Sequence, residues 1–142
     1  MKKPPIYTRD DFNFWTSIRT RWGDMDGLRH INHAAYLSYM ESARLDFYQY
    51  LGYEYTRWDM EVSTILAGMK IDYFQQTEHP ATFDIGQSIT RVGNTSFDIA
   101  TAVFIKEDLI PVVQGLFTLV AFDYNSNKSI LVPLTFRQAL EK

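Results

Sequence analysis

One stretch of the chain has the spacing of a long amphipathic helix, and the rest of the sequence offers no second stretch of this length. Apolar residues recur in it at intervals of three and four, the period of one helix face; they are Tyr36, Met40, Ala43, Phe47 and Leu51. Asn32 before the stretch is a good N-cap, and Gly52 after it is a good stop signal. The pattern predicts a helix over about 33–51. At 1.5 Å per residue such a helix is about 28 Å long, enough to cross a whole sheet.

The remaining segments have the alternation and the turn residues that are typical of strands. Strands are expected at Phe12–Trp22, Ser63–Gln75, Ala81–Arg91, Ser96–Lys106 and Val112–Asp123, with a short one near Ser129–Val132. A closing helical turn is expected at Pro133–Leu140. Because strands joined by short turns pair in antiparallel fashion, the sequence predicts an α+β fold with an antiparallel sheet of about five strands.

Length and composition exclude several classes of protein. The 142 residues are expected to form one domain spanning 1–142. No apolar run approaches the roughly 20 residues of a membrane span, and no apolar stretch follows Lys2 and Lys3 to make a signal peptide, so a cytoplasmic location is expected. The absence of cysteine excludes a thiolate nucleophile and sulfur-ligated zinc. A net charge of −3 gives no basic field for nucleic acid.

A polar segment directly before the predicted helix has the composition of an active site. Asp24, Asp26, His30 and His33 lie there within ten positions. A carboxylate held opposite the free N–H groups of a helix N-terminus supplies a base or nucleophile together with a polariser for a carbonyl oxygen, which acyl transfer needs. The residues alone leave two alternatives open, because Asp26 can also be a turn or capping residue and Asp with His can also ligate a metal. We expect no metal and no cofactor.

Motifs along nearly the whole chain carry a resemblance to a known family. They are Arg21-Trp22-Gly23-Asp24-Met25-Asp26, His30-Ile31-Asn32-His33, Tyr36-Leu37 and Glu41-Ser42-Ala43-Arg44, with later echoes in Arg91–Phe97 and Phe122-Asp123. With these motifs the chain resembles the acyl-CoA thioesterases of the 4-hydroxybenzoyl-CoA thioesterase type. The resemblance implies the hotdog fold, in which an antiparallel sheet wraps around one long central helix. It also implies hydrolysis of an acyl-CoA thioester to the free acid and coenzyme A.

The resemblance assigns roles to two residues of this segment. Asp26 looks like the family's catalytic carboxylate, and His33 occupies the helix start, where its backbone N–H is the expected polariser of the thioester carbonyl. A thiolate with a pKa near about 8.5 can leave without a strong general acid, so this small set of groups suffices. Asp26 either attacks the acyl carbon or deprotonates a water that does so, and the sequence leaves both routes open.

Further residues are candidates for binding the substrate. His30 is expected to fix the loop or to meet the substrate, and Asn32 to cap the helix at the edge of the site. Arg91, with Thr95 and Ser96 close behind it, is the candidate contact for the phosphates of coenzyme A; Arg57 and Lys70 are weaker candidates. Glu41 is kept as a reserve catalytic residue, because some hotdog thioesterases carry their carboxylate on this helix.

Two positions are singled out for other reasons. Arg29 departs from the family pattern, which often has a glycine before the histidine, and Gly27 is expected to supply the missing flexibility. Aromatic residues suited to an acyl pocket, a subunit interface or the core are Tyr53, Tyr55, Trp58, Tyr73, Phe74 and Phe83.

The expected partners follow from the same resemblance. The substrate is an acyl-CoA, with acyl carrier protein as the alternative carrier. An exposed sheet edge invites pairing with another chain, so a homodimer or homotetramer is expected. Two other functions remain open: a hydratase or dehydratase of the same fold acting on acyl thioesters, and a non-catalytic module that binds acyl-CoA.

Overall fold

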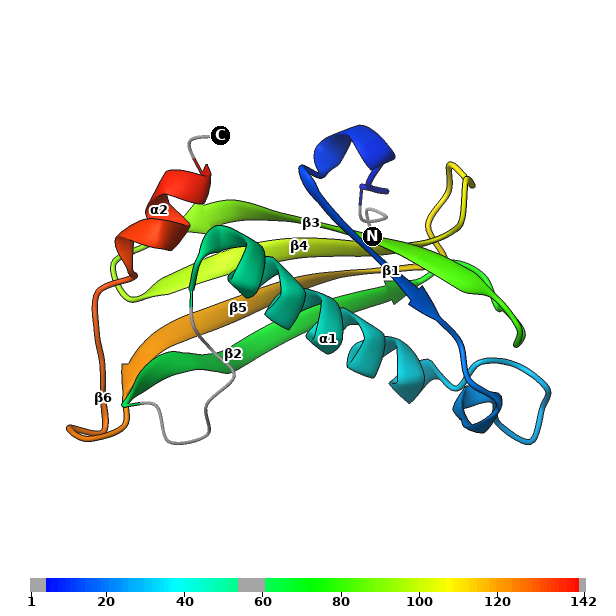
Figure 1. The fold of residues 1–142 in the computed structure, drawn as a ribbon, viewed down its shortest axis with the longest axis horizontal. Coiled ribbons are helices and arrows are strands. Elements are labelled where there is room, and N and C mark those ends of the chain that lie inside the picture. The colour runs from blue at the N-terminus through cyan, green and yellow to red at the C-terminus, as the bar shows by residue number, and fades with distance from the viewer. Residues whose placement is uncertain (1–4, 54–60, 141–142) are drawn as a thin grey trace.

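The computed structural model describes residues 5–53 and 61–140, and Tyr55, Arg57 and Trp58 of the sequence predictions lie outside this part. One long helix and five long strands make up the fold (Figure 1). The strands are β1 Phe14–Arg19, β2 Val62–Tyr73, β3 Thr82–Val92, β4 Ser96–Ile105 and β5 Val113–Asp123, with the two-residue β6 Lys128–Ser129. The helices are α1 His33–Leu51 and α2 Leu134–Leu140, with single 3-10 turns at η1 Arg9–Asp11 and η2 Trp22–Asp24.

All strand pairs of the sheet are antiparallel, and the order is β1-β3-β4-β5-β2, with β6 added to β5. The sheet curls around α1, which runs across its concave face (Figure 1). This is the hotdog arrangement of an antiparallel sheet around a central helix. The connection between β1 and α1 crosses the end of the sheet and carries the polar segment that holds Asp26.

The main core lies between α1 and the concave face of the sheet. Tyr36, Met40, Ala43 and Phe47 of α1 are buried there. The rings of Tyr36 and Tyr39 lie 5.8 and 5.7 Å from the ring of Phe83 on β3. Each fully buried apolar side chain of this size contributes roughly 1.5–3 kcal/mol relative to an exposed one. This burial fixes the position of α1, and so of its N-terminus, on the sheet.

A second, smaller core covers part of the convex face. Phe12 packs there with Ala100, Ala102 and Phe104. Gly86 of β3 is required for this approach, because a Cβ at that position would lie 2.7 Å from Cγ of Phe12. The N-terminal segment that carries Phe12 is thereby attached across β3 and β4.

Most of the predicted elements are confirmed, and the differences lie at the ends. The helix has the predicted bounds, Asn32 caps it, and Gly52 ends it in the left-handed conformation with φ 86°. The first strand ends at Arg19 instead of Trp22, because residues 22–24 form the 3-10 turn η2.

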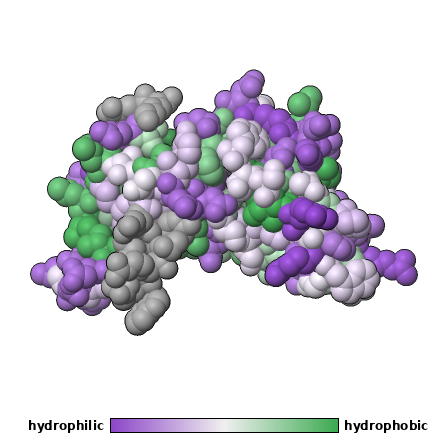
Figure 2. Space-filling view, in the orientation of Figure 1, coloured by the Kyte–Doolittle hydropathy of each residue, from purple (hydrophilic) through white to green (hydrophobic). Residues whose placement is uncertain are grey.

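The last predicted strand is also shorter. Only Lys128–Ser129 pairs with β5 as a strand. After it, the N–H groups of Ile130 and Val132 donate to Ala121 and Asn94, so this segment crosses the ends of β5 and of the β3–β4 turn. Hydrophobic residues gather on the surface at this crossing, where Leu131 and Leu134 are exposed (Figure 2). Within the described residues, no helix is long and apolar enough to cross a membrane.

Candidate active site

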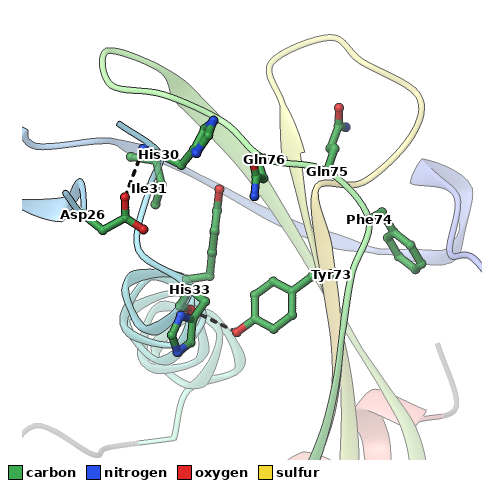
Figure 3. A pocket seen from close by; sticks show the side chains of 9 residues that line it. Asp26, His30, Ile31, His33, Tyr73, Phe74, Gln75 and Gln76 are labelled. Carbon is green, nitrogen blue, oxygen red and sulfur yellow. Dashed lines mark hydrogen bonds between the residues drawn. The ribbon is translucent and has the colours of Figure 1, made fainter. Parts of the chain in front are cut away.

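A cavity of about 360 Å³ opens where the N-terminus of α1 meets the end of β2 (Figure 3). Its lining comes from three parts of the chain: the loop after η2, the first turn of α1, and the segment in which β2 ends. The residues are Asp26, His30, Ile31, His33, Tyr36, Tyr73, Phe74, Gln75 and Gln76. The predicted catalytic pair, Asp26 and His33, therefore lies at one pocket.

The loop before α1 holds Asp26 by its backbone and by one carboxylate oxygen. The N–H of Asp26 donates to the carbonyl of His30 at 2.8 Å. Oδ1 of Asp26 accepts hydrogen bonds from the N–H groups of Leu28 at 2.8 Å and His30 at 3.3 Å. Within the described part of the chain, Oδ2 makes no hydrogen bond. One oxygen thus orients the carboxylate, and the other remains available to a substrate or a water.

The turn of this loop depends on Arg29, which adopts a left-handed backbone with φ 69°. Glycine is the residue that takes this conformation without steric cost. A glycine at position 29 would therefore form this turn without strain. It also corrects the expectation for Gly27, because the residue that takes the positive φ is Arg29 itself.

Asp24, two positions before Asp26, is buried and has several partners. Its carboxylate accepts hydrogen bonds from the Tyr39 hydroxyl at 2.5 Å, the Arg21 backbone N–H at 2.9 Å and Arg21 Nη2 at 3.1 Å. Its carbonyl accepts the N–H of Asn32 at 2.8 Å. These contacts connect the loop to α1, so Asp24 has a structural role in the loop.

The partners of Asp24 also set its electrostatics. Burial raises the pKa of Asp24, but the hydrogen bonds from Tyr39 and Arg21 outweigh it, so the pKa lies below its ordinary value of 3.8. Burial, and then the hydrogen bond to this carboxylate, raises the pKa of Tyr39. Asp24 is thus held as a buried anion and Tyr39 as a neutral donor.

The N-terminus of α1 is open toward the pocket. The side chain of Asn32 caps it by accepting the N–H of Ala34 at 3.0 Å. The backbone N–H of His33, the first helical residue, makes no hydrogen bond within the described residues. A free N–H at a helix N-terminus is a donor for developing negative charge on an oxygen.

The wall opposite the loop comes from the end of β2. The Tyr73 hydroxyl donates to the His33 carbonyl at 3.0 Å, and Figure 3 shows the side chain reaching across to α1. Behind it, the hydroxyls of Tyr36 and Thr77 are 2.5 Å apart, and the N–H of Ile31 donates to the Thr77 carbonyl at 2.7 Å. Thr77 therefore links the loop, the helix and the segment after β2.

The other predicted site residues are distributed unevenly. His30 lines the pocket, whereas Asn32 serves as the helix cap and Glu41 is exposed on α1 outside the pocket lining. Lys70 is exposed on β2 and also lies outside the lining.

Arg91, Thr95 and Ser96 lie at the other end of the sheet, in and beside the turn between β3 and β4 (Figure 1). Arg91 donates to both carboxylate oxygens of Asp98 at 2.9 and 3.1 Å and to Ser96 Oγ at 3.0 Å. These residues do not line the pocket at Asp26. Their assignment to the coenzyme A phosphates stays a prediction.

The sequence interpretation missed part of the pocket wall. Gln75 and Gln76 line the pocket, and Thr77 supports it, but no motif marks any of them as functional. Ile31 also lines the pocket; it lies inside the His30-Ile31-Asn32-His33 motif but was given no role. Tyr73 and Phe74 were candidates for an acyl pocket only as members of a larger set of aromatic residues. Among the described residues there is no group of three His, Asp or Glu side chains that could hold a metal ion.

Comparisons with known proteins bear on the family and the fold. The model of the thioesterase-like superfamily matches residues 20–140. The crystal structure of the PA5185 protein from Pseudomonas aeruginosa strain PAO1 has a TM-score of 0.86 at 25% identity, covering 96% of this chain and 95% of that one. The PA2801 protein from Pseudomonas aeruginosa has a TM-score of 0.83 at 28% identity, with 89% and 96% covered.

A more distant structure shares the fold. Slr0204, a 1,4-dihydroxy-2-naphthoyl-CoA thioesterase from Synechocystis, has a TM-score of 0.81 at 14% identity, with 91% of this chain and 96% of that one covered. The search of the curated proteins finds no match.

Proposed function

The chain belongs to the thioesterase-like superfamily, and we propose that it hydrolyses an acyl-CoA thioester to the free acid and coenzyme A. Membership of the family makes thioester hydrolysis the general reaction class. One observation carries the finer proposal: Asp26 lines a pocket together with the N-terminus of α1 and has one carboxylate oxygen without a hydrogen bond in the described chain.

In the proposed mechanism, the carbonyl oxygen of the thioester accepts the backbone N–H of His33. This contact stabilises the negative charge that develops on that oxygen when the acyl carbon is attacked. Asp26 then acts in one of two ways. It attacks the acyl carbon, expels the thiolate of coenzyme A and forms a mixed anhydride that water hydrolyses, or it takes a proton from a water that attacks directly.

The test of the reaction is the release of free thiol from aliphatic and aromatic acyl-CoAs by the purified protein, run beside acyl carrier protein loaded with the same acyl groups. We expect hydrolysis of the coenzyme A thioesters. Hydration of an enoyl-CoA without thiol release would contradict the proposal in favour of a hydratase. Saturable binding of acyl-CoA without turnover would contradict it in favour of a binding module.

A single turnover in water labelled with heavy oxygen detects the anhydride route when water attacks the Asp26 carbonyl of the anhydride. In the anhydride route, attack of water at the Asp26 carbonyl puts the label in Asp26, whereas attack at the acyl carbon puts it in the acid product. Mass spectrometry of the Asp26 peptide and of the product measures where the label is. Repeated turnovers would accumulate label in Asp26 only if this residue forms the anhydride. Label confined to the product after many turnovers supports activation of water, or an anhydride attacked only at the acyl carbon.

We also propose that the protein forms a homodimer or homotetramer through the edge strand β2. This strand is 12 residues long and pairs on one side with β5. Its apolar side chains Ile65 and Leu66 are 37% and 41% exposed. A long apolar edge is a template for pairing with another chain. Light scattering on the purified protein should give a multiple of the chain mass, and a monomer at all concentrations would contradict the proposal.

A further inference from the structure

We propose that the pocket admits a compact acyl group, of the size of one ring or a short chain, and that Tyr73 is the side chain that sets this limit. The inference rests on the proposed function, because it concerns the acyl part of the same substrate.

Tyr73 spans from β2 to α1 at the pocket, with 46% of its surface exposed. It is the last residue of β2, and its hydroxyl is tied to the His33 carbonyl on α1 at 3.0 Å. Its ring centre lies 6.4 Å from that of His33 and 6.2 Å from that of Tyr36, both in edge-to-face contact. Tyr36 is itself buried and bonded to Thr77. Two tyrosine rings, each held by a hydroxyl contact, therefore form part of the pocket wall beside the reacting centre. Figure 3 shows Tyr73 reaching from β2 to α1.

Beyond Tyr73, the same face of β2 continues as an apolar strip. Side chains two apart on a strand share a face, and Ile71 lies on the Tyr73 side, with its Cδ1 2.8 Å from where a Cβ on the facing Gly115 would lie. Met69 follows, opposite the core residue Phe117. Met69 is 51% exposed, so α1 does not cover this part of the strand. A long acyl chain passing Tyr73 would find apolar surface there, and the ring of Tyr73 stands at its beginning.

The size of the cavity supports the same conclusion. Its volume of about 360 Å³ is near the lower end of the roughly 300–1,000 Å³ range of small-molecule sites. The thioester and the end of the pantetheine arm occupy part of this space. The remainder suits a ring or a short chain, and a long alkyl chain would have to extend beyond it.

The experiment measures kcat/KM for butyryl-, benzoyl-, lauroyl- and palmitoyl-CoA, each below its critical micelle concentration. For the wild type we expect kcat/KM for butyryl- and benzoyl-CoA to exceed that for palmitoyl-CoA by at least about tenfold. This factor is the lower end of the loss that a mismatch in a hydrophobic pocket causes. In Tyr73→Ala, the ratio of lauroyl- to benzoyl-CoA should rise by about tenfold, because the path to Ile71 and Met69 is open.

Two further variants test whether the ring of Tyr73, and not its hydroxyl or the loss of any tyrosine, sets the preference. Tyr73→Phe keeps the ring and loses only the hydrogen bond to His33, so it should retain the wild-type preference. Tyr50→Ala removes a tyrosine that is 66% exposed near the other end of α1, and the preference should not change. Thermal unfolding of each variant shows whether it is folded at the assay temperature.

Other results would overturn the inference. A wild type that hydrolyses palmitoyl-CoA as well as benzoyl-CoA contradicts the size limit, and an unchanged lauroyl-to-benzoyl ratio in Tyr73→Ala contradicts the role of Tyr73. If no acyl-CoA is hydrolysed, the proposed function fails, and calorimetric binding of the same four compounds tests the inference separately. Tighter binding of the compact compounds supports it, and equal or tighter binding of palmitoyl-CoA overturns it.

Discussion

The two ends of the sheet carry similar polar residues but differ in how far their hydrogen-bonding groups are used. At the β3–β4 turn, Arg91 donates hydrogen bonds to Asp98 and Ser96. Asp98 also accepts a hydrogen bond from the hydroxyl of Thr118 at 2.8 Å. At the pocket end, Oδ2 of Asp26 makes no hydrogen bond in the described chain. A cluster of polar residues is therefore weak evidence for a functional site. A hydrogen-bonding atom that lies beside a cavity and has no partner in the described chain is strong evidence.

The same contrast holds within the loop before α1. Asp24 and Asp26 are two positions apart, yet the buried carboxylate of Asp24 accepts three hydrogen bonds while Asp26 is exposed at the pocket. Asp24 stabilises the loop, and Asp26 remains available to react with a substrate or a water. Substitutions at the two positions should therefore affect different quantities.

The largest effect is expected from Asp26→Asn. This change keeps the size of the side chain and removes the base or nucleophile, so kcat should fall by about a hundredfold to ten-thousandfold. The free energy of unfolding should change little, because Asp26 is exposed. Thiol release and urea unfolding measure the two quantities. Asp10→Asn, an exposed aspartate in η1, is the matched control and should keep wild-type kcat. Wild-type turnover in Asp26→Asn would refute the mechanism.

The next effect is expected from removing the backbone N–H of His33. His33→Pro does this at the first helical position, where proline is tolerated, and Asn32 before it already has the extended backbone that proline requires, with ψ 133°. Loss of one donor to the developing oxyanion should lower kcat by about a hundredfold to a thousandfold.

His33→Ala is the comparison, because it keeps the N–H and removes the ring. It should retain most of the activity, with circular dichroism confirming the helix in both variants. If kcat falls as much in His33→Ala as in His33→Pro, the imidazole ring and not the backbone N–H is the group that catalysis needs.

A structural effect is expected from Asp24→Asn. The variant keeps the shape but loses the charge that accepts from Tyr39 and Arg21, and hydrogen bonds to a charged group contribute about 1.5–3 kcal/mol. Urea unfolding at neutral pH should show a loss of this size. A larger loss of kcat than in Asp26→Asn would contradict the division of roles between the two aspartates.

The pH dependence of the same pair gives a second test of Asp24. Its pKa in the folded protein lies below the ordinary 3.8, so the stability it contributes is complete above that value and is lost as the pH falls through the folded pKa. The gap in unfolding free energy between wild type and Asp24→Asn should narrow on acidification. A difference that widens below pH 3.8 would show that the pKa of Asp24 is not lowered in the folded protein.

A smaller gain is expected from Arg29→Gly. Arg29 has φ 69°, and an L-residue in this conformation costs roughly 1–2 kcal/mol relative to glycine. The greater freedom of glycine in the unfolded chain offsets part of this, so the net stabilisation should be about 1 kcal/mol or less. Glu107→Gly, with φ 73° in the turn after β4, is the matched control away from the pocket. Destabilisation by Arg29→Gly alone would show that the arginine side chain contributes to the loop.

The sequence predicted the elements whose signals are local. The helix from His33 to Leu51 has its cap, its stop and its apolar period within one segment, and its bounds are confirmed. The end of β1 was missed because Asp24, which caps the 3-10 turn at Trp22, is held by Tyr39 of α1, a partner that only the fold brings close. Gln75 and Gln76 were missed for a similar reason, since only the packing of β2 beside α1 brings them to the pocket.

The smallest effect is expected from Arg91→Ala, at the end of the sheet where the polar groups are already paired. The side chain is 45% exposed, and exposed ion pairs contribute about 0.2–1 kcal/mol, so urea unfolding should show a loss in this range. Because Asp98 and Ser96 take up Nε and Nη2 of Arg91, these groups would have to leave their partners to reach a phosphate, and KM for acyl-CoA should stay within about twofold of the wild type. Asp98→Ala completes the comparison, since it releases Arg91 from its partner. A KM that rises severalfold in Arg91→Ala and falls in Asp98→Ala would make Arg91 a contact of the carrier, and the contrast between the two ends of the sheet would no longer hold.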